Sequence, residues 1–368
     1  MLGIIQNIVP TLVVLSVLIF IHELGHFLFA KLSGVAVEKF SLGFGPELIK
    51  FSYKGTVYAL SLIPLGGFVK LAGEVLEDRK EGELKPTDYL SQSLIKRFAI
   101  IFSGPCMNYL LAFILLIIVF MSGSPSIAPV IGDIIDNFPA QEAGIIVNDR
   151  VIAVDSVEVS TWDEMRKAIG ISHNEVITLQ VLRGDEERSI TLMPKVVSET
   201  NAFGDEIHAR KIGVVPGDES VFIKYSFPDA VKEAAVSTYS ITTLTYRALY
   251  RLVTGRLTPR ALSGPLGIIM ITNRVAKQGI VTLMQFTAFL SISLAIFNLL
   301  PIPALDGGHL FFIIFEAIFR KPVNFKLQER FAQVGFTLLM VLMLFVVWND
   351  AINFNLIEKI KQIIPFIK

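Results

Sequence analysis

The sequence predicts a polytopic α-helical membrane protein with about four transmembrane helices, an inserted α+β domain and a membrane-edge β-hairpin region. Three observations predict this class. Hydrophobic residues make up 52% of the 368 residues and charged residues only 18%, whereas soluble proteins carry roughly 25% charged residues. Long apolar segments occur near both ends of the chain. Between them lies a stretch of short, alternating strand-like runs.

Four apolar segments account for the membrane part of this prediction, at residues 4–30, 98–120, 281–300 and 331–348. Each is close to the roughly 20 residues that a helix needs to cross about 30 Å of hydrocarbon. The first segment has no Lys or Arg before Ile21 and no small-residue cleavage site. We therefore expect a retained helix there and not a cleaved signal peptide.

Basic residues predict how the chain crosses the membrane. Ten Lys or Arg lie between the first two segments, and four lie between the last two. Because basic loops stay in the cytoplasm, we expect both of these regions to be cytoplasmic. The termini and the long central stretch then lie on the opposite side. The formal net charge is +0, so the chain as a whole has no excess of positive charge for binding nucleic acid.

The region between the first two segments combines a hairpin pattern with a turn-rich apolar stretch. Alternating residues at 47–58 flank Lys54-Gly55, which predicts a β-hairpin. Residues 64–74 are apolar but too short to span a bilayer. We interpret them as a re-entrant or membrane-edge hairpin that lies against the spans.

The central stretch predicts a small α+β domain at 126–196. Its strand-like runs lie at 128–135, 150–159, 176–183 and 188–194. A helix is expected from Thr161, whose hydroxyl and Glu164 form a capping-box pattern. The full division is 1–125 for the first membrane part, 126–196 for this domain, 197–278 for a linker and amphipathic interfacial helix, 279–350 for the second membrane part and 351–368 for an amphipathic tail.

The first apolar segment contains the pattern H-E-x-x-H as His22, Glu23 and His26. On a helix, positions i and i+4 share a face, so both imidazoles can reach one Zn²⁺. Glu23 can act as a general base on a water molecule there. Such groups inside an apolar span are expensive and usually functional. The plain alternative is a helix end with snorkelling polar groups, since Lys31 follows within about one turn.

A catalytic zinc usually takes a third protein ligand and keeps an open position, and Asp306 is the candidate for that ligand. It follows Pro301 and Pro303, which end the third apolar helix. We expect Gly307 and Gly308 to let this backbone approach a neighbouring helix closely. An ordinary helix exit with an Asp-Gly turn is the structural alternative. His309 is a competing ligand, although Asp306 is preferred.

Several motifs resemble the site-2 protease family of intramembrane zinc metalloproteases, most closely its RseP-like branch. They are HELGH at 22–26, GFGP at 43–46, PLGGFVKLAGE at 64–74, SGPCMN at 103–108, SGPLGI at 263–268 and NLLPIPALDGGH at 298–309. Their order and spacing match the family over nearly the whole chain.

The resemblance implies a zinc metalloendopeptidase that performs site-2 cleavage of single-span membrane proteins. It implies that His22, His26 and Asp306 bind Zn²⁺ and that Glu23 activates water. It further implies that Asn298 and the 64–74 hairpin, with Gly66, Gly67 and Phe68, hold the substrate in an extended form, and that Asn108 supports core packing. Anti-sigma factors and remnant signal peptides are typical substrates in the family. The implied location is the bacterial inner membrane, with the active site toward the cytoplasm and the 126–196 domain outside.

The domain at 126–196 resembles a single PDZ domain, carried by residues 139–169. One departure is Asn148, where such domains usually have Gly, although Asn also tolerates a left-handed turn. The residues leave open whether this domain binds peptide ends or excludes bulky substrates. Two other functions are open to such a chain, a zinc-stabilised membrane scaffold and a transporter. Glu23 disfavours the scaffold, and the absence of internal sequence repeats disfavours the transporter.

Overall fold

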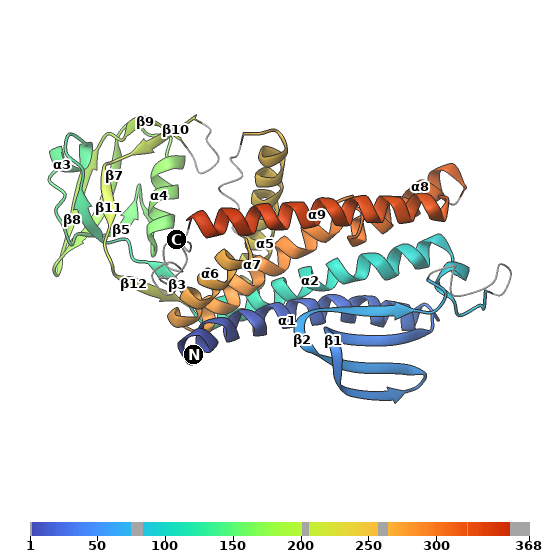
Figure 1. Cartoon of the computed structure of the whole chain (residues 1–368). Helices are drawn as coiled ribbons and strands as arrows, with labels where there is room; N and C mark the ends of the chain where they lie inside the picture. The colour runs from blue at the N-terminus through green and yellow to red at the C-terminus, as the bar shows by residue number, and fades with distance from the viewer. Residues whose placement is uncertain (1, 75–83, 201–205, 257–263, 322, 354–368) are drawn as a thin grey trace, which may run out of the picture. The chain divides into compact units, whose positions relative to one another are not determined.

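The computed structural model describes residues 2–74, 84–200, 206–256, 264–321 and 323–353 (Figure 1). The chain forms two compact units. The first contains Met1–Val119, Ala230–Leu249 and Thr258–Lys368, and the second contains Phe120–Asp229 and Tyr250–Leu257. Of the expected amphipathic tail at 351–368, residues 354–368 lie outside the described residues.

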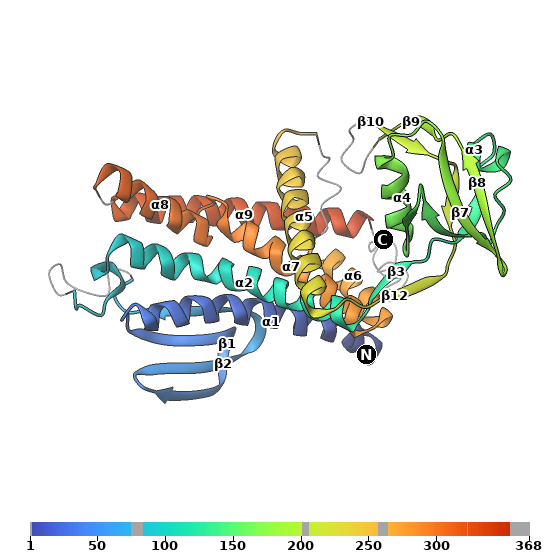
Figure 2. The same ribbon diagram turned by 180° about the vertical axis from the view of Figure 1, so that it is seen from behind.

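Four long helices form the frame of the first unit: α1 (Leu2–Leu32), α2 (Leu94–Ser122), α7 (Ile280–Leu299) and α9 (Phe325–Asn353). Each contains a stretch long and apolar enough to cross a membrane, which confirms the four predicted spans. They run alongside one another in both views (Figures 1 and 2). Many of their large apolar side chains are exposed, as expected for helices that face lipid.

Three further helices complete this frame. The amphipathic helix expected within 197–278 is α5 (Phe227–Val253). Two others were not predicted, α6 (Pro265–Gln278) and α8 (Asp306–Phe319). Asp350 of α9 is 1% exposed, and its carboxylate accepts hydrogen bonds from the backbone N–H groups of Gly264 and Gly267 at 2.9 and 3.0 Å. Because these N–H groups have no partner within the helix, Asp350 caps α6 and ties it to α9.

A bent two-stranded sheet, β1 (Val37–Tyr53) and β2 (Thr56–Leu71), lies beside α1 (Figures 1 and 2). The predicted turn at Lys54-Gly55 is confirmed, and both residues have positive φ. Residues 39–42 face 57–60 in one register and 67–70 in a second, because both strands bend and return on themselves. The stretch at 64–71 is therefore part of β2, in place of the separate hairpin expected at 64–74.

The second unit is built on a four-stranded sheet in the order β6-β5-β7-β8. Its strands are β5 (Arg150–Val154), β6 (Val157–Glu158), β7 (Ile177–Arg183) and β8 (Glu186–Leu192), and the short helix α3 (Pro139–Glu142) precedes them. Helix α4 (Trp162–Ile171) buries Met165 and Ile169 in the core that this sheet contributes to. The capping box of Thr161 and Glu164 is confirmed by reciprocal hydrogen bonds at 3.1 and 3.3 Å.

Six further strands belong to this unit. They are β3 (Ser124–Ile127), β4 (Ile131–Ile134), β9 (Lys195–Thr200), β10 (Glu206–Lys211), β11 (Val214–Pro216) and β12 (Ser220–Ile223). Three of them, β10, β11 and β12, lie wholly beyond the expected 126–196 domain. β11 pairs with β4 and β12 pairs with β3. Strands β10, β11 and β12 and most of β9 thus lie where a linker was expected, and β11 and β12 complete the pairing of strands that begin the unit. Asn148 has φ +73, the left-handed turn expected for it.

Candidate metal centre

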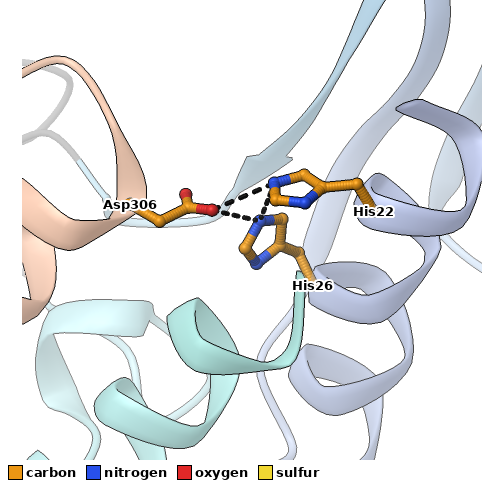
Figure 3. Close-up of side chains that lie close together, drawn as sticks. All are labelled: His22, His26 and Asp306. Carbon is orange, nitrogen blue, oxygen red and sulfur yellow. Dashed lines mark hydrogen bonds and ion pairs between the residues drawn. The ribbon is translucent and has the colours of Figure 1, made fainter. Parts of the chain in front are cut away.

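His22 and His26 project from one face of α1 and meet Asp306, the first residue of α8 (Figure 3). Both histidines are 8% exposed. Their Nε2 atoms lie 3.2 Å apart, and Asp306 Oδ2 lies 3.0 Å from His22 Nε2 and 3.5 Å from His26 Nε2. The structure thus brings together the three residues expected to bind metal, and among the described residues they form one candidate metal group.

Asp306 reaches this position because the chain folds tightly after α7. The helix ends at Leu299, and the irregular backbone that follows includes Ala304 with φ +75. A side-chain carbon on Gly307 would lie 2.0 Å from the carbonyl oxygen of Leu300, and one on Gly308 would lie 2.7 Å from that of Ile302. The two glycines were expected to approach a neighbouring helix. They instead pack on the segment just before them, which lets α8 start directly against it.

An ion pair at the far end of α8 fixes the direction of that helix. Arg97, near the start of α2, lies 2.7 Å from Glu316 of α8, and the side chains are only 11% and 24% exposed. Nearby, Leu310 and Ile313 of α8 pack in a buried apolar cluster with Ile100 and Ile101 of α2. Helix α8 is therefore held at both ends, by the glycine contacts at its start and by Glu316 near its finish.

The three converging atoms have the chemistry of a cation site. His26 Nδ1 lies 2.8 Å from the carbonyl oxygen of Ile100, which can only accept a hydrogen bond, so Nδ1 carries the ring hydrogen. In the neutral ring, Nε2 then presents a lone pair to the centre. Asp306 Oδ2 is buried and has no hydrogen-bond partner in the described part of the chain. Lone pairs that face one another in this way repel unless a cation lies between them.

The separations and the ionisation of the group also fit zinc. Donor atoms bound to one tetrahedral zinc at about 2.0–2.1 Å lie roughly 3.3 Å apart, close to the 3.0, 3.2 and 3.5 Å found here. An ordinary Asp carboxyl is ionised at neutral pH, and a cation held between Asp306, His22 and His26 would favour the carboxylate further. A metal ligand of this type must be in that form.

Helix α2 packs against the histidines through small residues. A side-chain carbon on Gly104 would lie 2.3 Å from His26 Nε2 and 2.9 Å from His22 Cε1, and one on Gly25 of α1 would lie 2.5 Å from the carbonyl oxygen of Ser103. Pro105, inside α2, removes one helical hydrogen bond next to this contact. The motif at 103–108 thus lies against the metal centre. From the sequence, Asn108 was expected only to support packing. The Gly-Pro pair inside an apolar span could have indicated that this part of α2 lies against the site.

A pocket of about 270 Å³ opens beside the three residues, and it is lined by Ile19, His22, Glu23, Gly66, Gly67, Leu294, Asn298, Ala304, Leu305 and Asp306. A side-chain carbon on Gly67 would lie 3.2 Å from Glu23 Cγ, so β2 approaches the Glu23 side chain closely. The Asn298 amide nitrogen lies 3.4 Å from His22 Nε2. Glu23, Gly66, Gly67 and Asn298 thus share one pocket with His22 and Asp306, two of the three candidate ligands.

Two other candidate residues lie differently. Phe68 is not among the residues that line the described pocket. Its ring stacks on Phe44 at a centroid distance of 6.4 Å, and Lys39 Nζ lies 5.2 Å from its centroid. These contacts hold the Phe68 ring beside Phe44 and Lys39 of β1. His309 is exposed and lies outside the group formed by His22, His26 and Asp306.

Replacing Gly104 with Ala is expected to weaken zinc binding, because the new methyl group would overlap the His26 ring. That ring cannot swing away without losing its bond to Ile100. We expect a loss comparable with that of an outer-shell partner, roughly 10–100-fold in metal affinity. Zinc content after titration with a competing chelator measures it.

Gly170→Ala is the matched control for this substitution. Gly170 lies in α4, and a side-chain carbon there would meet nothing within 4 Å. Zinc affinity should then be unchanged and stability equal or slightly higher, since Ala is the better helix former. Full zinc affinity in Gly104→Ala would show that the two imidazoles do not need the space beside Gly104.

Comparison with known proteins identifies the class of this centre. Residues 10–342 match Peptidase family M50, the site-2 protease family. The chain belongs to this family. It is a zinc metalloprotease, Zn²⁺ is its expected cofactor, and its apolar helices fit a polytopic membrane protein. The scaffold and transporter alternatives are therefore set aside.

Relatives from several bacteria match over nearly their whole length. A Campylobacter jejuni protein is 38% identical over 92% of both chains, and an Agrobacterium fabrum protein is 36% identical over 93% of this chain and 95% of its own. Both names contain the words zinc metalloprotease. Zinc metalloprotease RasP of Geobacillus kaustophilus is 32% identical over 95% of this chain and 99% of its own.

Proposed function

We propose that this metalloprotease cleaves single-span membrane proteins within their apolar segment, the site-2 step of regulated intramembrane proteolysis. The observation that carries the proposal is the position of the metal centre. His22, Glu23 and His26 lie inside an apolar helical stretch, Ile8–Leu32, whose composition suits a membrane span, and Asp306 meets the two histidines there. Ionisable groups at such depth are expected to be functional.

His22, His26 and Asp306 would hold the zinc ion, and Glu23 would move the protons. Zinc bound there supplies Lewis-acid chemistry and makes a water molecule acidic at neutral pH. Glu23 is the only carboxylate other than Asp306 among the residues that line the described pocket. It would take a proton from water as general base and return it to the leaving nitrogen as general acid.

Strand β2 offers a surface on which the substrate can be held in an extended form. A helical substrate hides each scissile carbonyl in an i→i−4 hydrogen bond, so local unwinding must precede attack. Inside a bilayer the unwound backbone must find new partners, and a strand edge supplies them by β-augmentation. Gly66 and Gly67 bring β2 into the pocket without side chains, and Asn298 faces it from α7. This geometry supports a positioning role for these three residues, and it does not support one for Phe68.

The second unit supports the proposal that the chain carries one PDZ domain. A groove of about 560 Å³ lies between α4 and residues 208–216. Trp162, Ile169, Ile212, Val214 and Pro216 are among its lining residues. In the described residues β11 pairs only with β4, so its other edge is free for a peptide to add as a strand. We infer that this groove either binds an exposed end of the substrate or limits the size of what approaches.

The basic segments on either side of the metal centre favour an inner-membrane orientation with the active site toward the cytoplasm and the second unit outside. Substrates would be single-span proteins such as anti-sigma factors or remnant signal peptides, trimmed beforehand on the outer side. In this arrangement the residues in contact with lipid are the exposed apolar side chains of the spans.

The direct test is to reconstitute the full chain in vesicles with a tagged single-span peptide and to map the products by mass spectrometry. We expect cleavage inside the apolar segment, stopped by a zinc chelator and restored by zinc. A matched peptide with Gly and Asn at its centre should be cut faster than one with Leu there, because it unwinds more easily. Cleavage confined to the soluble flanks of the peptide would contradict the proposal.

A further inference from the structure

We propose that Asn108 of α2 positions His22 for zinc by accepting a hydrogen bond from the Nδ1–H group of its ring. Asn108 is 0% exposed, and its side-chain amide nitrogen is placed 3.3 Å from His22 Nδ1. Its amide oxygen is buried and has no hydrogen-bond partner among the described residues. The inference rests on the proposed ligand set of His22, His26 and Asp306.

The chemistry of His22 decides which end of the amide faces the ring. His22 Nε2 points at His26 Nε2 and Asp306 Oδ2, at 3.2 and 3.0 Å, so a metal ligand must keep its lone pair on Nε2. The ring hydrogen of the neutral imidazole then lies on Nδ1. A hydrogen on Nδ1 needs an acceptor, and only the oxygen end of the Asn108 amide can accept. The two ends of an amide are alike in shape, and the hydrogen-bond network determines their assignment. Rotating the amide by half a turn places Oδ1 against Nδ1–H.

The same helix provides the matching contact to the second histidine. The carbonyl oxygen of Ile100 lies 2.8 Å from His26 Nδ1, and it also accepts a hydrogen bond from the Ser103 hydroxyl at 2.6 Å. Ile100, Gly104 and Asn108 are spaced four residues apart, so they share one face of α2. Along that face, Ile100 orients His26, Gly104 makes room for both rings, and Asn108 orients His22. Partners of this kind fix the tautomer and the direction of a ligand ring.

Asn108 is itself held in place from α7. Its backbone carbonyl accepts a hydrogen bond from the Ser291 hydroxyl at 2.7 Å, and Ser291 is 0% exposed. This contact uses the backbone of Asn108 and leaves its side chain free to face His22. The two roles of Asn108, helix packing through the backbone and ring orientation through the amide, can therefore be separated by substitution.

The experiment measures zinc affinity of the purified full chain by chelator competition, together with the visible spectrum of the cobalt-substituted protein. Asn108→Leu keeps the shape but removes the acceptor, and it should lower zinc affinity roughly 10–100-fold and change the cobalt spectrum. Asn108→Asp keeps an acceptor oxygen and should stay within a few-fold of the parent chain. Ser291→Ala, which breaks only the link between α2 and α7, should leave both readouts unchanged.

The outcomes distinguish failure of the proposed role of Asn108 from failure of the proposed ligand set. Parental zinc affinity in Asn108→Leu, or a larger loss in Asn108→Asp than in Asn108→Leu, would overturn the role of Asn108. An equal loss in Ser291→Ala would show that helix packing is responsible and would overturn it as well. If Asn108→Leu does not fold, a more than tenfold loss in Asn108→Asp overturns the inference and retention supports it. His22→Ala serves as the reference, since zinc retained in that variant would instead refute the proposed ligand set.

Discussion

Replacing Glu23 with Gln is expected to abolish peptide cleavage while zinc remains bound. The substitution keeps the size of the side chain and removes its ability to take up and release a proton. Because Glu23 is assigned both proton transfers, we expect a loss at or beyond the upper end of the 10²–10⁴-fold range for general acid–base catalysis. The ligand residues His22 and His26 flank Glu23 on α1 but are unchanged in this variant. Zinc content by elemental analysis and cleavage of a single-span peptide in vesicles measure the two effects separately.

Glu47→Gln is the matched control for this experiment. Glu47 lies on β1, outside the described pocket, where Lys39 and Lys50 pair with it at the surface. Such exposed ion pairs contribute only about 0–1 kcal/mol, so cleavage and zinc content should both stay near parental values. If Glu23→Gln cleaves at the parental rate, another group must activate water. If it loses zinc together with activity, Glu23 is needed for metal binding and its role as a base is not established.

Features that depend on local sequence were predictable. Membrane helices are recognised from hydropathy alone, since every backbone polar group in a span must bond within it, and all four were placed correctly. The cap at Thr161 and the turn at Lys54-Gly55 were predictable because residues three or fewer positions apart decide them. The pairing of His22 with His26 belongs to the same class, because the helical repeat alone places both on one face.

Features that depend on distant contacts were not predictable in the same way. Asn108 and His22 are 86 residues apart in sequence, and Asn298 and His22 are 276 apart. Nothing in the local pattern of 103–108 indicates which ring Gly104 or Asn108 will meet. Helix α8 was missed because Gly307 and Gly308 look like a turn. Glycine is needed at both positions in the first turn of the helix, because a side chain at either one would collide with the segment before it.

The same distinction applies to the second unit. Its first strands and helix were predicted from alternation and capping, but its end was placed at 196. Strands β11 and β12 are short, and they gain their partners only when the chain returns to β4 and β3. Three or four residues carry too little periodicity to be recognised without those partners. The full pairing of β1 and β2 was not predicted for the same reason, because its second register depends on a bend that local patterns do not encode.

Replacing Asp306 with Asn is expected to remove most of the zinc, and it distinguishes Asp306 from His309 as the third ligand. The amide is neutral and a poorer ligand than a carboxylate, and it also leaves the charge of the cation uncompensated. We therefore expect a loss of zinc affinity larger than the roughly 10–100-fold cost of an outer-shell partner. His309→Ala should bind zinc normally, because His309 is exposed and lies outside the candidate metal group. The glycine contacts that start α8 are the same in both variants, so a difference between them reports the ligand and not the fold of the segment. Unchanged zinc in Asp306→Asn combined with its loss in His309→Ala would transfer the role to His309.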